Sequence, residues 1–261
     1  MAHQQTLLSG YDRIQHFFMK KIYLIVIAFT LANISSGQAV FIEHAKIEFE
    51  RKVNVWANIT GDFAEQFRKS VPQFKTDYFD FEFDGTKALY QPGRSAGVQK
   101  TGFFGSAPAS ENVVYSDYKE GRYTARKNVF EKTYLISDSL RQATWKITND
   151  FREIAGFKCR RATTVIMDSV FVVAFYTDEI MVPGGPESFG GLPGMILGLV
   201  INRVHCTWYA TRVDLTKTDS SKLIPPVKGT PISSEALTRT LRSTFTNWGK
   251  EADRNIWWIS L

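Results

Sequence analysis

Residues 169–201 of the chain read SVFVVAFYTDEIMVPGGPESFGGLPGMILGLVI. The stretch opens and closes with runs rich in β-branched and aromatic residues, Ser169–Thr177 and Met195–Ile201, which favour strands. Between them, Pro183–Gly194 contains five glycines and three prolines. Glycine permits positive φ and proline fixes φ and removes a donor, so this segment cannot form a regular helix or a central strand. The pattern predicts a structured loop held between two core strands.

Short alternating runs separated by turn residues extend over most of the chain and indicate antiparallel hairpins. We therefore expect a mainly β fold, either a curved antiparallel sheet or a partly open barrel, with a β-sandwich as the alternative. Further strands are expected at Val40–Trp56, Lys127–Ser137 and Gln142–Asn149. The predicted hairpins are Tyr78–Tyr90 (turn Asp84-Gly85), Asn112–Arg126 (turn Glu120-Gly121), Phe151–Thr177 (turn Asp168-Ser169) and Met195–Val213 (turn Asn202-Arg203).

The last part of the chain has a different pattern. Lys222–Pro231 reads as a linker, and Ser233–Trp248 has helical periodicity with Ser233 as a plausible N-cap. We expect this helix to pack on the sheet. The apolar end, Asn255–Leu261, is expected to dock on the domain, with a partner-binding tail as the alternative. A short helix is also expected at Gly61–Ser70, and no repeat is visible.

The N-terminal region predicts export. Met19-Lys20-Lys21 precedes an apolar segment of eleven residues, Ile22–Ala32, and a small-residue exit that ends near Ala39. This is the pattern of a secretory signal peptide, and the apolar segment is shorter than the roughly 20 residues of a membrane span. We therefore expect residues 1–18 to be an extension before the true start, 19–39 a signal peptide, 40–214 the β domain, and 215–261 a linker, helix and tail. An uncleaved anchor is the alternative.

Composition narrows the possible partners. The net charge is +6, and no run of five like charges occurs, so nothing indicates nucleic-acid binding. The signal segment has no cysteine, which argues against a lipid-anchored form. We expect an exported protein of the periplasm or cell surface that has no transmembrane helix after cleavage and an unknown envelope ligand or protein as its partner.

Searches for catalytic motifs find no zincin, nucleophile-elbow, phosphate-loop or Cys-x-x-Cys pattern. We assign no catalytic residues, cofactor or metal. His44 and His205 could bind a metal with Asp178 only if the fold brought them together. Asp178, Glu179 and Glu187 flank the loop and are acidic candidates for a paired-carboxylate hydrolase. The alternative, which we favour, places Asp178 and Glu179 at a solvated strand end and Glu187 at the loop surface.

Cys159 and Cys206 are the two cysteines of the chain. An oxidising compartment permits a disulfide between them, provided that their Cα atoms lie about 4.4–6.8 Å apart. Two buried free thiols are the alternative.

The loop also carries a resemblance. Gly191-Leu192-Pro193-Gly194-Met195-Ile196-Leu197 resembles the signature of the GLPGLI family of exported bacterial proteins. Met195 stands where leucine is usual and Phe175 where tryptophan is usual, and both remain large and apolar. The likeness extends to Gly156-x-x-Cys159-x-x-Ala162-Thr163, Ala174-Phe175-Tyr176-Thr177, Glu179-Ile180, Gly185-Pro186 and Phe189, and is most specific over residues 145–201.

What the resemblance implies is an exported, mainly β protein without an assigned activity. The family is also similar to the N-terminal, non-catalytic domain of some peptide-N-glycosidases, which implies a binding or accessory role. A purely structural envelope domain and a glycan or peptide hydrolase are the alternatives. The motif-loop residues to follow in the structure are Gly185, Pro186, Phe189, Gly191, Leu192, Pro193, Gly194 and Ile196.

Overall fold

The computed structural model describes residues 41–59, 64–97, 108–215, 218–247 and 249–261, all within one unit, Phe41–Leu261. Residues 1–18 and the predicted signal peptide, residues 19–39, lie outside the described residues. The same holds for residues 61–63, where the predicted short helix begins, and for Trp248, where the predicted C-terminal helix ends.

The described chain is mainly β, as the sequence predicts. The helical elements are α2 (Val55–Asn58), α3 (Ala64–Ser70), η2 (Asn202–Val204), η3 (Ser220–Lys222), α4 (Ser234–Thr244) and α5 (Lys250–Ser260). The strands are β1 (Ala45–Asn54), β2 (Phe74–Phe83), β3 (Lys87–Pro92), β4 (Val113–Asp117), β5 (Arg122–Val129), β6 (Lys132–Ser139), β7 (Lys146–Ile154), β8 (Phe157–Ile166), β9 (Val170–Thr177), β10 (Met195–Ile201), β11 (Cys206–Asp214) and β12 (Thr230–Ile232).

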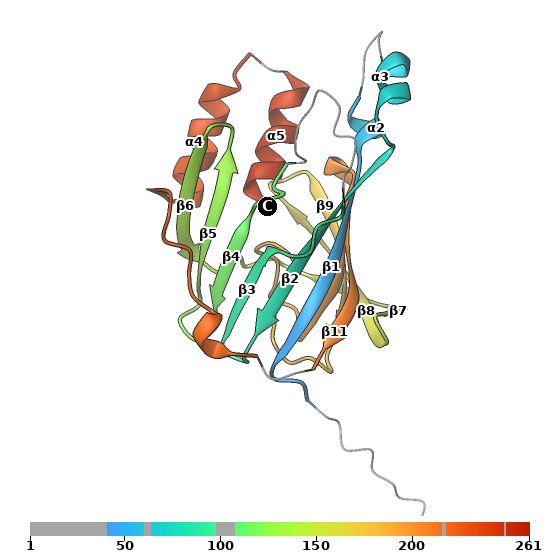
Figure 1. Ribbon diagram of the computed structural model, residues 1–261, viewed down its shortest axis with the longest axis vertical. Helices are drawn as coiled ribbons and strands as arrows, with labels where there is room; N and C mark the ends of the chain where they lie inside the picture. The colour runs from blue at the N-terminus through green and yellow to red at the C-terminus, as the bar shows by residue number, and fades with distance from the viewer. Residues whose placement is uncertain (1–40, 60–63, 98–107, 216–217, 248) are drawn as a thin grey trace, which may run out of the picture. The chain divides into compact units, whose positions relative to one another are not determined.

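These strands form one sheet in the order β12-β6-β5-β4-β3-β2-β1-β11-β10-β9-β8-β7. Two meanders, β1–β6 and β7–β11, meet where β1 pairs antiparallel with β11. The β12–β6 pair is parallel, so the sheet is mixed. The sheet curls strongly (Figure 1), yet its end strands β12 and β7 do not pair with each other in the described part of the chain. The fold is therefore an open, curved sheet that does not close into a barrel, as predicted, and the sandwich alternative does not apply.

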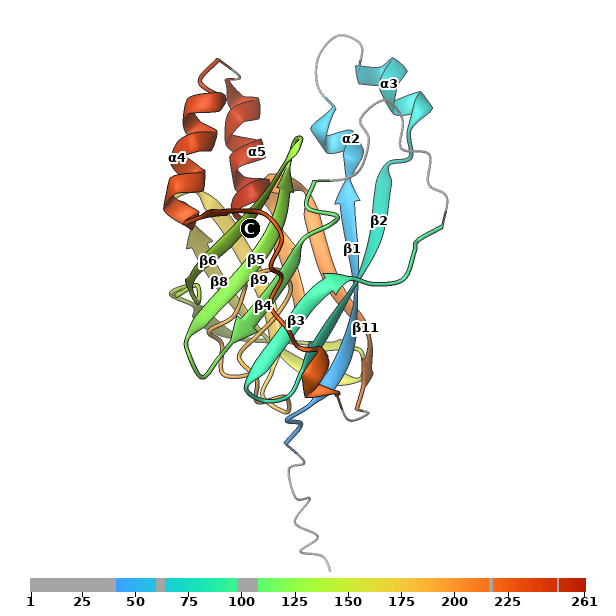
Figure 2. The same ribbon diagram turned by 60° about the vertical axis from the view of Figure 1, so that its left-hand side comes forward.

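Period-two alternation places the core on the inner face of the sheet. In β1, residues Ala45, Ile47 and Phe49 are fully buried, and the residues between them are partly exposed. The inward side chains of β2, β9, β10 and β11 continue this layer, and buried residues of α4 and α5 complete it. α4 lies alongside the β5–β6 hairpin, from Tyr123, which contacts Ser234, to Phe130, which contacts Phe245, and α5 packs next to α4 (Figure 2). They cover part of the face that an open sheet would otherwise expose.

Several boundaries differ from the predictions. Lys127 belongs to β5, and a turn at residues 130–131, where Phe130 has φ +54°, separates it from β6. A hairpin at Ala155-Gly156 joins β7 to β8, which the sequence analysis missed because it placed residues 151–168 in one strand. The predicted linker contains β12, and the apolar tail forms most of α5. Ser233 does cap α4, since its side chain accepts a hydrogen bond from Ala236 N.

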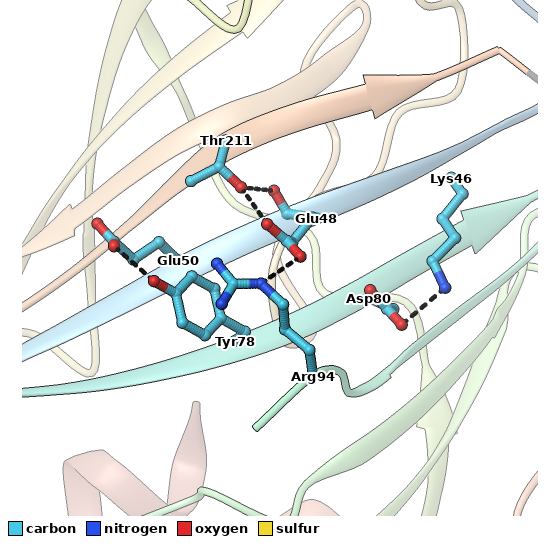
Figure 3. A network of polar contacts seen from close by, with 7 residues as sticks. All are labelled: Lys46, Glu48, Glu50, Tyr78, Asp80, Arg94 and Thr211. Atoms are coloured by element: carbon cyan, nitrogen blue, oxygen red, sulfur yellow. Dashed lines mark hydrogen bonds and ion pairs between the residues drawn. The ribbon is translucent and has the colours of Figure 1, made fainter. Parts of the chain in front are cut away.

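The outer face of β1 and β2 is polar and internally paired (Figure 3). Arg94 lies over the ring of Tyr78 and pairs with Glu48 at 2.8 Å, while Lys46 pairs with Asp80 at 2.8 Å. Such solvent-exposed pairs contribute little to stability. These side chains lie on the outer face of the strands and pair with one another, so we do not treat this face as a candidate site.

No helix in the described ranges is long and apolar enough to span a bilayer.

Candidate functional site

The loop Pro183–Gly194 joins β9 to β10, which are neighbours in the sheet. It folds back on itself, because the N–H of Gly191 donates to Pro183 O at 3.1 Å. Gly194 has φ +137°, and a Cβ at this position would lie 2.0 Å from Thr177 O. Only glycine tolerates both conditions. The last glycine of the motif is therefore a steric requirement of the strand–loop junction.

The loop is part of the core. Phe189 and Leu192 anchor the loop, since each is only 2% exposed. Trp145 holds the loop from outside, since its Nε1 donates to Gly190 O at 3.0 Å. Of the remaining motif residues, Gly185, Pro186, Gly194 and Ile196 are buried, and Gly191 and Pro193 are exposed.

Glu187 is buried, which corrects our expectation of a loop-surface residue. It has φ +55° and is 2% exposed. Asn112 Nδ2 donates to Glu187 Oε2 at 2.8 Å, and Oε1 has no hydrogen-bond partner in the described part of the chain. The left-handed turn aims the side chain inward, toward the inner face of the sheet. A buried carboxylate oxygen without a partner is costly, so it needs an explanation.

Two cations lie near this carboxylate, Lys127, which is buried, and Arg141, which is partly buried. Lys127 of β5 is 4% exposed, and its Nζ donates to Ile259 O at 3.0 Å. Burial lowers the pKa of Lys127 to about 8, and the nearby charge of Glu187 opposes this shift. Arg141 follows β6, and burial also lowers its pKa, again with Glu187 opposing. The negative charge of Glu187 therefore stabilises the charged forms of both Lys127 and Arg141.

These side chains hold the end of α5. Lys127 bonds Ile259 O, and Arg141 donates to Ser260 O at 2.6 Å. Ser188, next to Glu187 in the loop, donates to Leu261 O at 2.6 Å. The last carbonyls of a helix lack internal partners and carry partial negative charge, so cations and hydroxyls stabilise them. The motif loop, Lys127 of β5 and Arg141 after β6 thus form a socket for the end of α5.

Another buried cation, Arg51, belongs to β1. Arg51 of β1 is fully buried and donates to Asp77 Oδ2 at 2.6 Å and to Pro108 O at 2.9 Å. Its guanidinium lies 5.0 Å from the ring centre of Phe79 and 5.7 Å from that of Trp258 on α5. The cation therefore ties the middle of the sheet to α5.

A pocket opens beside this cluster, and we call it the α5 pocket. Its volume is about 440 Å³, within the range of about 300–1,000 Å³ usual for ligand sites. Its buried lining includes Asn112, Lys127 and Trp258, and its exposed lining includes Asn128 and Phe130. The full lining is Pro108, Ala109, Ser110, Glu111, Asn112, Lys127, Asn128, Val129, Phe130, Asn255, Trp258 and Ile259.

The opposite side of α5 borders a second hollow of about 550 Å³, and Arg141 is part of the lining of this second hollow. Its other charged groups include Glu235, Arg239, Arg242 and Asp253, all of them exposed. Glu235 and Arg239 pair with each other across one turn of α4. Exposed charges of this kind are usual on the solvent side of a helix, whereas the α5 pocket has buried polar groups in its lining. The α5 pocket is therefore the stronger candidate for a binding site.

The structure does not bring the predicted acids together. Asp178 and Glu179 are exposed at the end of β9, whereas Glu187 lies in the core. His44 precedes β1 and is exposed, and His205 lies at the other end of β1, where its carbonyl accepts from Asn54 N. A strand of this length separates its ends by roughly 30 Å. No group of three or more potential metal ligands occurs among the residues described.

Cys159 and Cys206 are both buried free thiols. They lie on β8 and β11, and β9 and β10 run between those strands. Three inter-strand spacings of about 4.8 Å already exceed the reach of a disulfide. The disulfide alternative is therefore not formed, and the buried-thiol alternative describes both residues. Burial raises the pKa of Cys159 to about 12 and that of Cys206 further.

Sequence analysis missed the buried charges, although the alternation carried a signal. Arg51 continues the inward series Ala45, Ile47, Phe49, and Lys127 lies between the inward residues Ala125 and Val129. Long charged residues are almost never fully buried without a partner. A charge in the apolar phase of a strand is therefore a sequence signal for a buried ionic site. Asn112 and Arg141 lie outside strands, where no such phase exists.

One family model matches part of the chain. Residues 109–232 match the family described as N-glycanase peptide, N-terminal domain. This segment contains Asn112, Lys127, Arg141 and the whole motif loop. No curated protein matches the sequence.

Solved structures give only distant likenesses. PNGF-II in a P21 crystal has a TM-score of 0.49 and 17% identity, and the match covers 76% of this chain and 32% of that one. PNGF-II in a C2 crystal has a TM-score of 0.49 and 16% identity, with 82% and 32% covered. An uncharacterized conserved protein from Thermus thermophilus has a TM-score of 0.36 and 5% identity, with 72% and 90% covered. The chain thus matches about a third of the length of PNGF-II.

Proposed function

We propose that this chain is an exported, non-enzymatic accessory protein of the cell envelope that binds a ligand in the α5 pocket. The similarity of residues 109–232 to an N-glycanase N-terminal domain supports an accessory role in a glycan-related system. The signal-peptide pattern of residues 19–39 supports export to the periplasm or cell surface. The motif Gly191–Leu197 supports membership of the GLPGLI family.

One observation carries the binding role. A pocket of about 440 Å³ is lined by two polar side chains that are almost completely buried, Asn112 and Lys127. Asn112 in turn bonds Glu187, whose second oxygen has no partner in the described ranges. Folding such groups into a core costs free energy. A polar ligand that reaches them offsets this cost, which an apolar core would avoid.

The hydrolase alternative has less support. Paired-acid hydrolysis of a glycosidic bond uses two carboxyl groups about 5–10 Å apart across a cleft. Asp178 and Glu179 lie at the surface, and Glu187 is buried apart from them. A lipid-binding version is also unsupported, because amide and charged side chains line the α5 pocket.

The test has two parts. The full chain is expressed with its own N-terminus, and the intact mass of the exported product should correspond to cleavage near Ala39. Native mass spectrometry of the same product should then show a bound small molecule. The variant Asn128→Trp, at the exposed side of the pocket, should lose it.

The matched control is Asn202→Trp, an exposed asparagine in η2 outside the pocket. A ligand retained by both variants would show that binding occurs elsewhere. A protein that carries no small molecule and binds none from a metabolite and glycan panel would overturn the binding role.

A further inference from the structure

The charges of the α5 pocket are balanced. Its lining contains one cation, Lys127, and one carboxylate, Glu111. Glu111 would repel an anionic ligand, and Lys127 would repel a cationic ligand. A long acyl chain would cover the amides of Asn112 and Asn128 without hydrogen-bonding them, which is unfavourable. The lining therefore favours a ligand that is uncharged and polar.

The hydrogen-bonding groups point to the same class. The lining contains the amides of Asn112, Asn128 and Asn255 and the hydroxyl of Ser110. Asn112 donates to Glu187, and Asn128 donates to Glu111 and accepts from Thr133. Because an amide has two N–H donors and an oxygen that accepts two hydrogen bonds, both side chains keep a donor and an acceptor for a ligand that is rich in hydroxyl groups. Lys127 adds donors, since one hydrogen bond, to Ile259 O, is described for its three N–H groups.

Phe130 adds an apolar surface at the exposed side. Its side chain is 65% exposed, and its backbone has φ +54° in the turn between β5 and β6. Left-handed φ is unfavourable for a bulky residue, and turns of this kind favour glycine or asparagine. The ring of Phe245, the residue after α4, contacts the Phe130 ring edge-on, with the two ring centres 5.6 Å apart. An exposed aromatic ring kept in a strained turn is a reason to infer a binding role.

We propose that the α5 pocket holds the ring of a neutral saccharide, with one C–H face against Phe130 and hydroxyl groups bonded to the amides and Lys127. This rests on the proposed function, that the pocket binds a ligand. A pyranose ring combines an apolar C–H face with a rim of hydroxyl groups, which matches an aromatic wall facing a set of amides.

The experiment screens the purified wild-type protein against an array of neutral oligosaccharides built from hexoses, N-acetylhexosamines and deoxyhexoses. Sialylated and sulfated oligosaccharides and fatty acids form the comparison arms. The best neutral ligand is then titrated calorimetrically into wild type, Phe130→Ala, Asn128→Ala and Phe171→Ala. Phe171 is the matched control, an exposed phenylalanine (42%) on β9 outside the pocket.

We expect neutral saccharides to bind, and Phe130→Ala to bind roughly two- to tenfold more weakly, the loss typical of one aromatic contact. Asn128→Ala should also weaken binding, and Phe171→Ala should not. Unchanged binding by Phe130→Ala and Asn128→Ala would overturn the assignment to this pocket. Binding of charged compounds or fatty acids only, lost in Asn128→Trp, would overturn the ligand class and leave the binding role standing. Binding of nothing in any arm would overturn both.

Discussion

Lys127 should make the free energy of unfolding rise with pH in the alkaline range, and the substitution Lys127→Met should remove this dependence. Burial lowers the pKa of Lys127 from its ordinary value of 10.5 to about 8, while Glu187 opposes the shift and Arg141 adds to it. The unfolded chain therefore keeps this proton to higher pH than the folded protein does. Stability rises with pH wherever the unfolded state binds more protons. The contribution of Lys127 to the free energy of unfolding thus rises as the pH increases through the window from about 8 to 10.5.

The magnitude follows from the two pKa values. At pH 7 the buried ammonium costs about 3 kcal/mol relative to the neutral amine, and at pH 10 it costs about 1 kcal/mol. The difference in unfolding free energy between Lys127→Met and wild type should therefore shift by about 2 kcal/mol between pH 7 and pH 10, in favour of wild type. The thiols act in the opposite direction, because burial raises the pKa of Cys159 and Cys206 and so lowers stability above pH 9. Both proteins contain the thiols, so their contribution cancels in the difference.

Urea unfolding followed by tryptophan fluorescence at half-unit steps from pH 7 to pH 10 measures this difference. The variant Lys132→Met, an exposed lysine at the start of β6, is the control and should show a flat difference from wild type. A flat difference for Lys127→Met as well would refute the reasoning, since it would mean that Lys127 titrates alike in both states.

Three further predictions concern the loop, α5 and the thiols. Gly194→Ala should destabilise the protein by at least about 3 kcal/mol in urea unfolding, because its Cβ would clash with Thr177 O, whereas Gly121→Ala, with nothing within 4 Å of the new Cβ, should cost only about 1–2 kcal/mol; equal losses would contradict the steric account. Arg141→Met should lower the hydrogen-exchange protection of the last turn of α5 by about 1.5–3 kcal/mol and leave β9 unchanged, and unaltered protection there would refute the socket. Cys159 and Cys206 should react with a thiol reagent only after unfolding, since both are buried, and an intact mass that shows a disulfide would contradict the structure.

Local signals predicted much of the sheet. The turns at Asp84-Gly85 and Glu120-Gly121 lie between paired strands, as the predicted hairpins require. In the first strand, the buried residues Ala45, Ile47 and Phe49 alternate with polar ones, so a local pattern also indicates the inward face. The open, curved form of the sheet was one of two predicted forms. It depends on which strands meet over long sequence separations, above all on the pairing of β1 with β11. Periodicity contains no information on such pairings.

The candidate site was harder to predict for the same reason. Glu187 was singled out because it lies in the loop, but its burial depends on a left-handed backbone that a glutamate rarely adopts. Its partner Asn112 is 75 residues away in sequence, and Lys127 contacts Ile259 over a separation of 132 residues. The helical α5 was read as an apolar tail because its first half, Lys250–Asn255, is polar, and the apolar residues start at Ile256.

The loop and the α5 pocket are parts of one arrangement. The loop supplies Ser188 to the end of α5 and Glu187 to the cations that hold the same end. The pocket is lined by the adjacent residues of α5, Trp258 and Ile259, and by Lys127. A change in the loop that frees α5 must therefore change the pocket, even though no motif-loop residue lines it. A motif with a structural role can in this way be required for binding. The absence of a Cβ at Gly194 allows the loop to adopt its conformation, and the loop fixes the end of α5. Residues of α5 in turn form one wall of the proposed ligand site.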